Sequence, residues 1–490
     1  MPSQAKKITS DTAAIFIAKT ISLLLGLLRL KYIAIYLGVE TFGIYTFATY
    51  FVAMFSIFFD MGLGQILTRD IAADKSRTSE YLSSALLLKV LLFVATSIVI
   101  AGATYLSHFD VITNWAVAFS VFITGMTSLT TVFTGAFQAH REMKLISVIT
   151  IATDFFTSVI VIVLLILNYG LYGLMAGSAV VSLAMFVITF LLSYKFLNFS
   201  MVYHVRRLWG YLMREGFPVV VGVLGITLYL YATSALLKYL DGNVVAGYYN
   251  AALKIITILT VIPASFTLVI YPFFAELHVS DKGKLESVLN IAVRYMFTVS
   301  IPMAVGTIMV AKNLIATLYT TAFLPAAPAL QILIISSMFG YGDYILYTFL
   351  PAINRQQFGM RITIPAGIIV AVVNYLLIPK FGLFVPSLSL AVVEIVMFVA
   401  GYFYLRRLQY SLSLTKIFLK PMLSCIPMAV VVYVISKIFV SKFSVLIQIP
   451  VAAVVYATSF YLMKGLLEED KLILEKILPS PIKEKILKHI

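Results

Sequence analysis

The sequence predicts an all-α integral membrane protein of about 14 transmembrane helices, in two pseudo-symmetric six-helix lobes followed by two C-terminal helices. Three observations predict this fold. Of the 490 residues, 61% are hydrophobic and 12% are charged, about half the charged share of a soluble domain. The apolar residues form long continuous runs, whereas the strands of membrane barrels alternate over about 10 residues. A short pattern near residue 40 returns about 204 residues later. Together these observations exclude a soluble enzyme and a disordered chain.

Fourteen windows are long and apolar enough to span a bilayer, which takes about 20 residues. The first six are 11–37, 41–67, 81–106, 112–137, 143–167 and 171–196. The next six are 208–240, 244–274, 287–316, 328–353, 360–378 and 383–405, and the last two are 417–438 and 443–463. The polar start runs into the first window without a small-residue cleavage site, so we expect a retained first helix. The charged, amphipathic residues 464–490 are predicted to lie at the membrane surface.

The positive residues predict the orientation. There are 36 Lys and Arg against 21 Asp and Glu, a net charge of +15. With the amino terminus in the cytoplasm, 26 of the 36 are assigned to the cytoplasmic side, six to the interior of helices and four to the outer side. The outer four are Lys312, Lys380, Lys437 and Lys442. Because cytoplasmic loops carry an excess of Lys and Arg, we expect a multi-pass protein of the cell membrane with both termini cytoplasmic. The excess charge therefore indicates orientation and no nucleic-acid partner.

The repeated pattern predicts how the chain is divided. A long helix ends near Tyr36–Gly38 and its return helix opens with Gly43-Ile44-Tyr45; likewise Tyr239–Asp241 leads to Gly247-Tyr248-Tyr249. The interval equals six predicted helices, which is typical of transporters built from repeats. The predicted parts are an N-lobe of residues 1–205, a C-lobe of 206–410, two further helices in 411–463 and a tail of 464–490. The alternative is that Gly is common in membrane helices and Tyr at their ends.

The same stretches carry a family resemblance. Its motifs are Gly26–Arg29, Leu37-Gly38, Phe42–Tyr45, Asp60–Leu63, Thr68–Ala72, Glu215-x-x-Pro218 and Asp241 with Gly247–Ala251. They resemble the openings of both halves of prokaryotic polysaccharide repeat-unit flippases, which belong to the multidrug/oligosaccharidyl-lipid/polysaccharide exporter superfamily. The resemblance implies a non-enzymatic flippase that moves a polyprenyl-(pyro)phosphate-linked glycan across the cytoplasmic membrane by alternating access. It also implies contact with membrane lipid and with glycan polymerases or glycosyltransferases.

Six positive residues fall within predicted spans, where ionisable groups are costly and therefore functional candidates. They are Lys19, Arg29, Lys31, Lys89, Lys238 and Lys254. If the repeat holds, Lys19, Arg29 and Lys254 line a central cavity and hold the substrate phosphate without a metal. We expect Lys31 and Lys89 to snorkel, and Lys238 to snorkel or to pair with Asp241.

Acidic and aromatic residues give further candidates. Asp154, Asp343 and Glu394 lie near mid-span, where each either takes up a proton or sodium ion or pairs with a cation and fixes packing. For Asp60 and Glu215, near the cytoplasmic ends, pairing is the favoured interpretation. The candidates for stacking on sugars are Tyr229, Tyr231 and Tyr249. Tyr229 and Tyr231 are two residues apart and point to different sides of a helix, and an interfacial belt is the alternative for Tyr249.

Other classes of protein lack support in the sequence. There is no Walker-type phosphate loop, and the single cysteine, Cys425, forms no disulfide or paired metal site. We expect no catalytic residue, cofactor or metal. One rival is a cation-coupled multidrug exporter of the same fold, which predicts a carboxylate-lined cavity with few cations. The other is a membrane polysaccharide polymerase or ligase, which predicts a large outer loop that this sequence does not contain.

Overall fold

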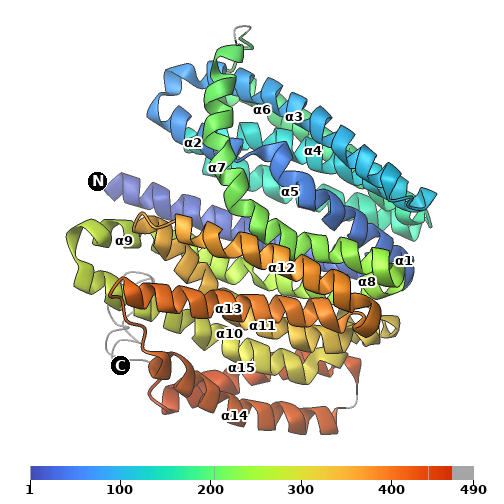
Figure 1. The fold of residues 1–490 in the computed structure, drawn as a ribbon, viewed down its shortest axis with the longest axis vertical. Coiled ribbons are helices and arrows are strands. Elements are labelled where there is room, and N and C mark those ends of the chain that lie inside the picture. Colours follow the sequence, from blue (N-terminus) through green and yellow to red (C-terminus); the bar gives the residue numbers. More distant parts are fainter. Residues whose placement is uncertain (1, 203–204, 440, 466–490) are drawn as a thin grey trace. The chain divides into compact units, whose positions relative to one another are not determined.

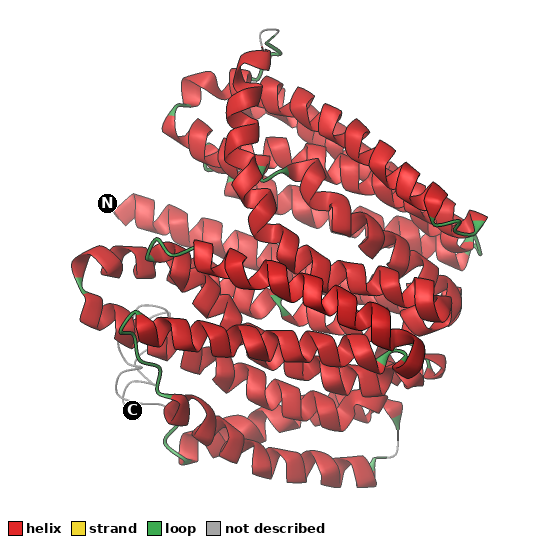
Figure 2. Ribbon diagram, in the orientation of Figure 1, coloured by secondary structure: helices red, strands yellow, loops and turns green. Residues whose placement is uncertain are grey.

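The chain folds almost entirely into long helices (Figure 1). The computed structural model describes residues 2–202, 205–439 and 441–465. Figure 2 shows helices joined by short loops, and no β-strand occurs in these ranges. Twelve helical segments among the described residues are long and apolar enough to cross a membrane. The prediction of an all-helical membrane protein is therefore confirmed, while most of the predicted tail, from residue 466, lies outside the described residues.

The helices group into two compact units. Unit 1 comprises Met1–Asn250 and Gly367–Pro379. Its helices are α1 (Pro2–Asp60), α2 (Leu63–Ala73), η1 (Lys75–Arg77), α3 (Thr78–Leu106), α4 (Val111–Ala139), α5 (Met143–Ile166), α6 (Gly170–Leu197), η2 (Val205–Leu208), α7 (Trp209–Thr227), the π-helical η3 (Leu228–Ala232) and most of α8 (Thr233–Leu259). The middle of α12 (Gln357–Phe381) also belongs to this unit.

Unit 2 comprises Ala251–Ala366 and the residues from Lys380 onward. It contains the end of α8 and both ends of α12. Its other helices are α9 (Val261–Ser280), α10 (Lys282–Leu318), η4 (Thr321–Ala326), α11 (Ala327–Ala352), α13 (Phe384–Arg407), α14 (Leu414–Ile438), η5 (Lys442–Ser444) and α15 (Val445–Leu462). The windows predict a link between residues 274 and 287, but helix continues through it and only Asp281 separates α9 from α10.

Two of the twelve segments are far longer than one bilayer crossing requires. Ile17–Ala73 has 57 residues and Arg206–Ser280 has 75. Each contains a glycine with non-helical backbone, Gly38 at φ 67° and Gly242 at φ 87°. Positive φ is accessible to glycine at little cost, so these are the positions at which each segment turns. The predicted count of fourteen requires that both segments cross the membrane twice, and it stays a prediction.

The repeated glycines contact each other's helices inside unit 1. A Cβ on Gly43 would lie 2.0 Å from the backbone oxygen of Asn243, and a Cβ on Gly247 would lie 2.5 Å from that of Val39. Adding 204 to 39 and 43 gives 243 and 247, so the two contacts are exchanged by the sequence repeat. The glycines are required here because the two backbones approach too closely for any side chain.

A polar contact continues the same symmetry. The Asn250 side-chain amide donates to the Thr46 hydroxyl at 3.0 Å, and these residues are 204 positions apart. The amide also donates to the Ser234 hydroxyl at 2.9 Å. Asn250 is fully buried, so the two bonds offset the cost of removing a polar group from water. The pattern seen in the sequence therefore marks a local pseudo-two-fold contact.

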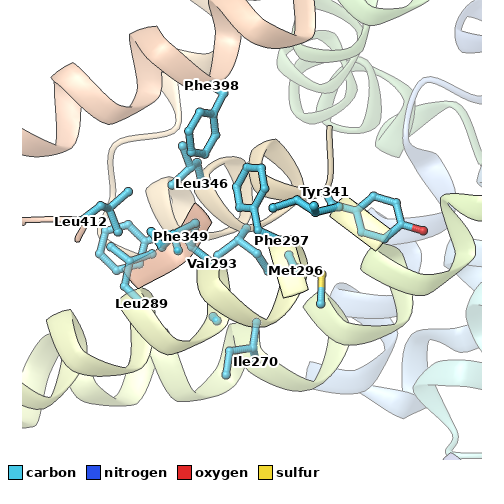
Figure 3. Close-up of a cluster of buried hydrophobic side chains, with 14 of the residues drawn as sticks. Ile270, Leu289, Val293, Met296, Phe297, Tyr341, Leu346, Phe349, Phe398 and Leu412 are labelled. Carbon is cyan, nitrogen blue, oxygen red and sulfur yellow. The ribbon is translucent and has the colours of Figure 1, made fainter. Parts of the chain in front are cut away.

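Each unit has its own apolar core. In unit 1 the core includes Leu67, Leu82, Phe133 and Phe137, all fully buried. In unit 2, Figure 3 shows Phe297, Tyr341, Phe349 and Phe398 among the residues that converge from α10, α11 and α13. The Phe297 ring meets the Phe398 ring edge-on with centroids 5.1 Å apart. Gly342 lies against both rings, because a Cβ there would be 2.7 Å from each.

Candidate functional site

Arg29 and Asp154, two predicted site residues, are neighbours in unit 1. The Arg29 Nη2 atom lies 4.0 Å from the Asp154 Oδ1 atom, and their side chains are 24% and 29% exposed. The separation is an ion-pair distance but exceeds the 2.7–3.2 Å of a direct hydrogen bond. Charge is therefore balanced between α1 and α5 without a tight contact. Lys19, two to three turns earlier on α1, is half-buried.

The helix contact beside this pair is close. The Ser158 hydroxyl of α5 donates to the Leu25 carbonyl of α1 at 3.3 Å. Ser158 follows Asp154 by four residues and Leu25 precedes Arg29 by four, so each lies on the same helix face as its charged neighbour. The helices therefore hold Arg29 and Asp154 opposite each other, which sequence depth alone did not predict.

Lys89 does not snorkel, contrary to the prediction. Its side chain has no exposed surface, and its ammonium pairs with the Asp60 carboxylate. It also donates to the Ser128 carbonyl at 2.8 Å and to the Thr131 hydroxyl at 2.6 Å. Snorkelling requires a side chain on a helix face that is exposed to lipid. Lys89 faces α1 and α4 instead. The prediction that Asp60 pairs with a cation is confirmed.

Lys238 also differs from the prediction of snorkelling or pairing with Asp241. Its ammonium lies 3.7 Å from Asp110 and donates to the Thr113 hydroxyl. It sits 4.4 Å above the Phe47 ring and 5.2 Å from the Phe109 ring. Aromatic faces attract cations, so this setting holds the charge within the protein. The carboxylate belongs to the residue that caps the start of α4, so the spacing of residues along α8 could not indicate it.

Glu215 lies in a surface network at the start of α7. Arg69 of α2 donates to Asp70 at 2.7 Å, to Glu215 at 2.9 Å and to the Tyr211 hydroxyl at 2.8 Å. The Tyr211 hydroxyl donates to Asp70 at 2.9 Å. The favoured interpretation of Glu215 as a structural partner is confirmed. Because Arg69 is 57% exposed, the network fixes α2 on α7 with only modest energy.

Asp343 and Glu394, the predicted acids of unit 2, are brought together by α11 and α13. Asp343 is 5% exposed, and the Glu394 carboxyl is its charged neighbour. Gly340 makes room for this arrangement, because a Cβ there would lie 3.1 Å from Glu394 Oε2. Asp343 is buried and Glu394 half-buried, and two adjacent carboxylates repel when both are ionised, so the pair favours a bound proton or cation. Lys254, the other predicted site residue of unit 2, is half-buried on α8.

The predicted sugar-stacking tyrosines lie in two settings. Tyr229 and Tyr231 belong to the π-helical segment η3, a helical form that is frequent at functional sites. Tyr231 stacks on Tyr50 of α1 with ring centroids 5.7 Å apart, and Tyr229 is 7% exposed. Tyr249 is fully buried. A sugar would reach Tyr249 only after a conformational change, whereas Tyr231 is half-buried.

The described residues contain no group of three or more His, Cys, Asp or Glu placed to hold a metal ion. Cys425 is buried. The candidate residues therefore form pairs of opposite charge in unit 1 and an acid pair in unit 2.

Comparison with protein families gives two matches. Residues 8–278 match the model described as polysaccharide biosynthesis protein, and residues 203–454 match the model described as lipid II flippase MurJ. Each match covers more than half of the chain. An uncharacterized membrane protein of Methanocaldococcus jannaschii is 25% identical over 397 residues, which are 75% of this chain and 77% of that relative.

Solved structures share the fold at low sequence identity. A lipid II flippase MurJ in an inward closed conformation has a TM-score of 0.70 at 16% identity, over 93% of this chain and 99% of that chain. An inward-facing multidrug resistance MATE transporter of the MOP superfamily has a TM-score of 0.62 at 17% identity, over 81% and 99%. A MOP superfamily transporter from Pyrococcus furiosus has a TM-score of 0.58 at 14% identity, over 82% and 96%. These likenesses establish the fold.

Proposed function

Because this chain belongs to the polysaccharide biosynthesis protein family, within the MOP superfamily of flippases and exporters, we propose that it translocates a lipid-linked oligosaccharide. The substrate would be a polysaccharide repeat unit on a polyprenyl (pyro)phosphate, moved from the inner to the outer leaflet of the plasma membrane by alternating access. The observation that carries this proposal is the loosely paired, half-buried Arg29 on α1. Its partners would be membrane lipid and the glycan polymerase or glycosyltransferase that uses the product.

The Arg29–Asp154 pair suits reversible binding of a phosphate. At 4.0 Å, Asp154 balances the guanidinium charge without a direct hydrogen bond. A phosphate that offers two oxygens forms a tighter, bidentate contact with the planar guanidinium. When the phosphate leaves, Asp154 again provides the balancing charge, so Arg29 is never left uncompensated. Lys19 and Lys254 remain further proposed ligands of the phosphate, and Tyr231 with Tyr229 the proposed sugar contacts.

The Asp343–Glu394 pair supports a coupling role. Uptake of a proton or monovalent cation by the pair would remove the repulsion between the carboxylates, so its loading state can bias the packing of α11 against α13. The same pair is the observation that favours the rival, a cation-coupled multidrug exporter. The two proposals differ in whether Arg29 is required for transport.

The test compares single variants in a prokaryote whose surface glycan depends on this gene. Arg29→Ala is expected to lower glycan export at least tenfold. Arg29→Lys should retain part of the export, because lysine keeps the positive charge but lacks the planar guanidinium. Lys31→Ala is the matched control, since it removes a cation two residues along the same helix. Normal export in Arg29→Ala, with the protein present in the membrane, would sink the phosphate role. Drug resistance that depends on Asp343 but not on Arg29 would instead support the exporter.

The proposed topology has its own test. We propose both termini in the cytoplasm, lobes of residues 1–205 and 206–410, and two further helices in 411–463. The one native cysteine, Cys425, is 4% exposed, so a single introduced cysteine reports its own accessibility. Lys380→Cys should react with a membrane-impermeant maleimide in intact cells, and Lys75→Cys only after lysis. The opposite pattern would overturn the orientation.

A further inference from the structure

A polar pocket in unit 2 lies where α10 meets the start of α14. Its lining includes Glu286, Ser287, Asn290 and Arg294 from α10, with Ser413 and Lys416 from the beginning of α14. The cavity holds about 190 Å³, below the roughly 300–1,000 Å³ of sites for drug-sized ligands. It therefore suits a small polar group and excludes a glycan.

Arg294 is the unusual residue of this pocket. It lies about three turns into α10 and is 5% exposed. Lys416 contributes a second positive charge to the same pocket from the neighbouring helix. Two cations that converge from different helices on one small cavity indicate an anionic ligand.

The single carboxylate of the lining is already engaged. One oxygen of Glu286 accepts hydrogen bonds from the Ser411 amide at 2.9 Å and from the Ser411 hydroxyl at 2.5 Å. Its role is to hold the segment before α14 against α10. The pocket therefore keeps a net positive charge after Glu286 is counted, which favours an oxyanion over a metal cation.

The pocket is also pre-organised. Asn290 accepts a hydrogen bond from the Ser413 amide at 3.0 Å and donates to the Ser411 carbonyl at 2.6 Å. These bonds fix the first residue before α14 and thereby the direction of its amino terminus. The Ser413 side chain makes no capping hydrogen bond to the helix. The positive end of the α14 dipole thus adds to the two side-chain charges at the pocket.

We propose that this pocket binds a phosphate oxyanion between α10 and α14. Arg294 supplies the planar guanidinium, Lys416 the point charge, and the Ser413 hydroxyl a further donor. The ligand is either free phosphate or the phosphate of an anionic lipid headgroup. The predicted orientation places these residues at the cytoplasmic side, where anionic lipids attract basic residues. The site is separate from Arg29, so its occupancy and glycan transport are independently measurable.

The test measures thermal unfolding of the purified full chain. One arm adds inorganic phosphate against chloride at equal ionic strength, and the other adds phosphatidylglycerol against phosphatidylcholine in nanodiscs. A ligand that binds the folded state raises the unfolding midpoint. Lys416→Gln is expected to weaken binding of the stabilising ligand about tenfold, because one charge-assisted hydrogen bond is lost. Arg294→Lys should weaken it as well while keeping the buried charge.

The matched control is Lys282→Gln, which removes an exposed cation from the same end of α10 but outside the pocket lining. Stabilisation by phosphate that falls in Lys416→Gln but not in Lys282→Gln supports a free-phosphate site. If phosphatidylglycerol alone stabilises the protein, and Lys416→Gln but not Lys282→Gln reduces that stabilisation, the site binds a lipid headgroup. Equal stabilisation of all variants, or none in the parent protein by either ligand, overturns the proposal.

Discussion

The two units arrange their charged side chains differently. In unit 1, Lys89 meets Asp60, Lys238 meets Asp110 and Arg29 faces Asp154, each across a helix boundary. In unit 2, groups of like charge lie together: Asp343 beside Glu394, and Arg294 with Lys416 in one pocket. A cation that faces a carboxylate is balanced without a ligand, whereas grouped like charges favour a bound proton or counter-ion. The charges of unit 1 are therefore balanced at rest, and in our proposal Arg29 exchanges Asp154 for the substrate phosphate. In unit 2, by contrast, the like charges themselves favour a bound ion.

The sequence repeat sharpens this contrast. Adding 204 to the number of Lys89 gives Val293, next to Arg294, so each half has a buried cation at nearly the same place. Lys89 has Asp60 as its partner. The corresponding offset from Asp60 gives Ala264, which carries no charge. In the second half, Arg294 instead lines a pocket together with Lys416.

The largest expected effect comes from breaking a pair in unit 1. Asp60→Ala leaves the Lys89 ammonium buried without its carboxylate, which should lower the free energy of unfolding by about 3–5 kcal/mol. Lys89→Met should lower it less, because Asp60 is 36% exposed and regains water. The double variant should recover most of the loss. Thermal unfolding in detergent measures all three, and a double variant no better than Asp60→Ala would contradict the pairing argument.

The next effect disturbs unit 1 without touching a charge. A methyl group at Gly43 would collide with the Asn243 backbone oxygen, so Gly43→Ala should destabilise by about 1–3 kcal/mol through overpacking. Gly247→Ala should behave alike if the contact is reciprocal. Gly26→Ala is the control on the same helix, because no atom lies within 4 Å of its added Cβ. Equal midpoints for Gly43→Ala and Gly26→Ala would show that the repeats do not meet there.

The sequence predicted these features unequally. The all-helical membrane fold and the turning glycines followed from composition and from the repeated pattern, because both are local properties. Arg29, Asp154, Asp343 and Glu394 were found as single candidates from their depth in a span. Their pairing was not, since depth along one helix does not tell which face meets which neighbour.

The same limit explains the errors. Lys89 lies near a span end, where snorkelling is the usual outcome, but its side chain faces two helices. Arg294 was assigned to the cytoplasmic side although it lies inside the predicted span 287–316, because it is near the start of that span. Helix α10 begins earlier, at Lys282, and Arg294 is buried about three turns into it. Position near the start of an apolar run therefore did not reveal that this side chain is buried in the protein.

A smaller effect of opposite sign is expected in unit 2. Asp343→Asn removes one of two neighbouring carboxylates, so the free energy of unfolding should rise by up to about 1 kcal/mol. Transport should at the same time lose its dependence on the coupling ion. Thermal unfolding and transport in vesicles with imposed proton or sodium gradients measure the two effects. A clear loss of stability would place Asp343 among structural pairs like Asp60 and weaken the contrast between the units.

The smallest effect tests a pair at the rim of unit 1. Burial alone would raise the pKa of Asp110, but hydrogen bonds from the Thr113 hydroxyl and amide, with the nearby Lys238 ammonium, hold it below its ordinary value of 3.8. A carboxyl whose pKa is lower in the folded state stabilises the fold at neutral pH, and this contribution is lost as the pH falls below about 4. Asp110→Asn still caps α4, so it should match the parent protein at acid pH and be slightly less stable at pH 7. Unfolding midpoints of the two proteins across that range measure the difference. Parallel curves would mean that Lys238 needs no charged partner, and that its aromatic neighbours suffice.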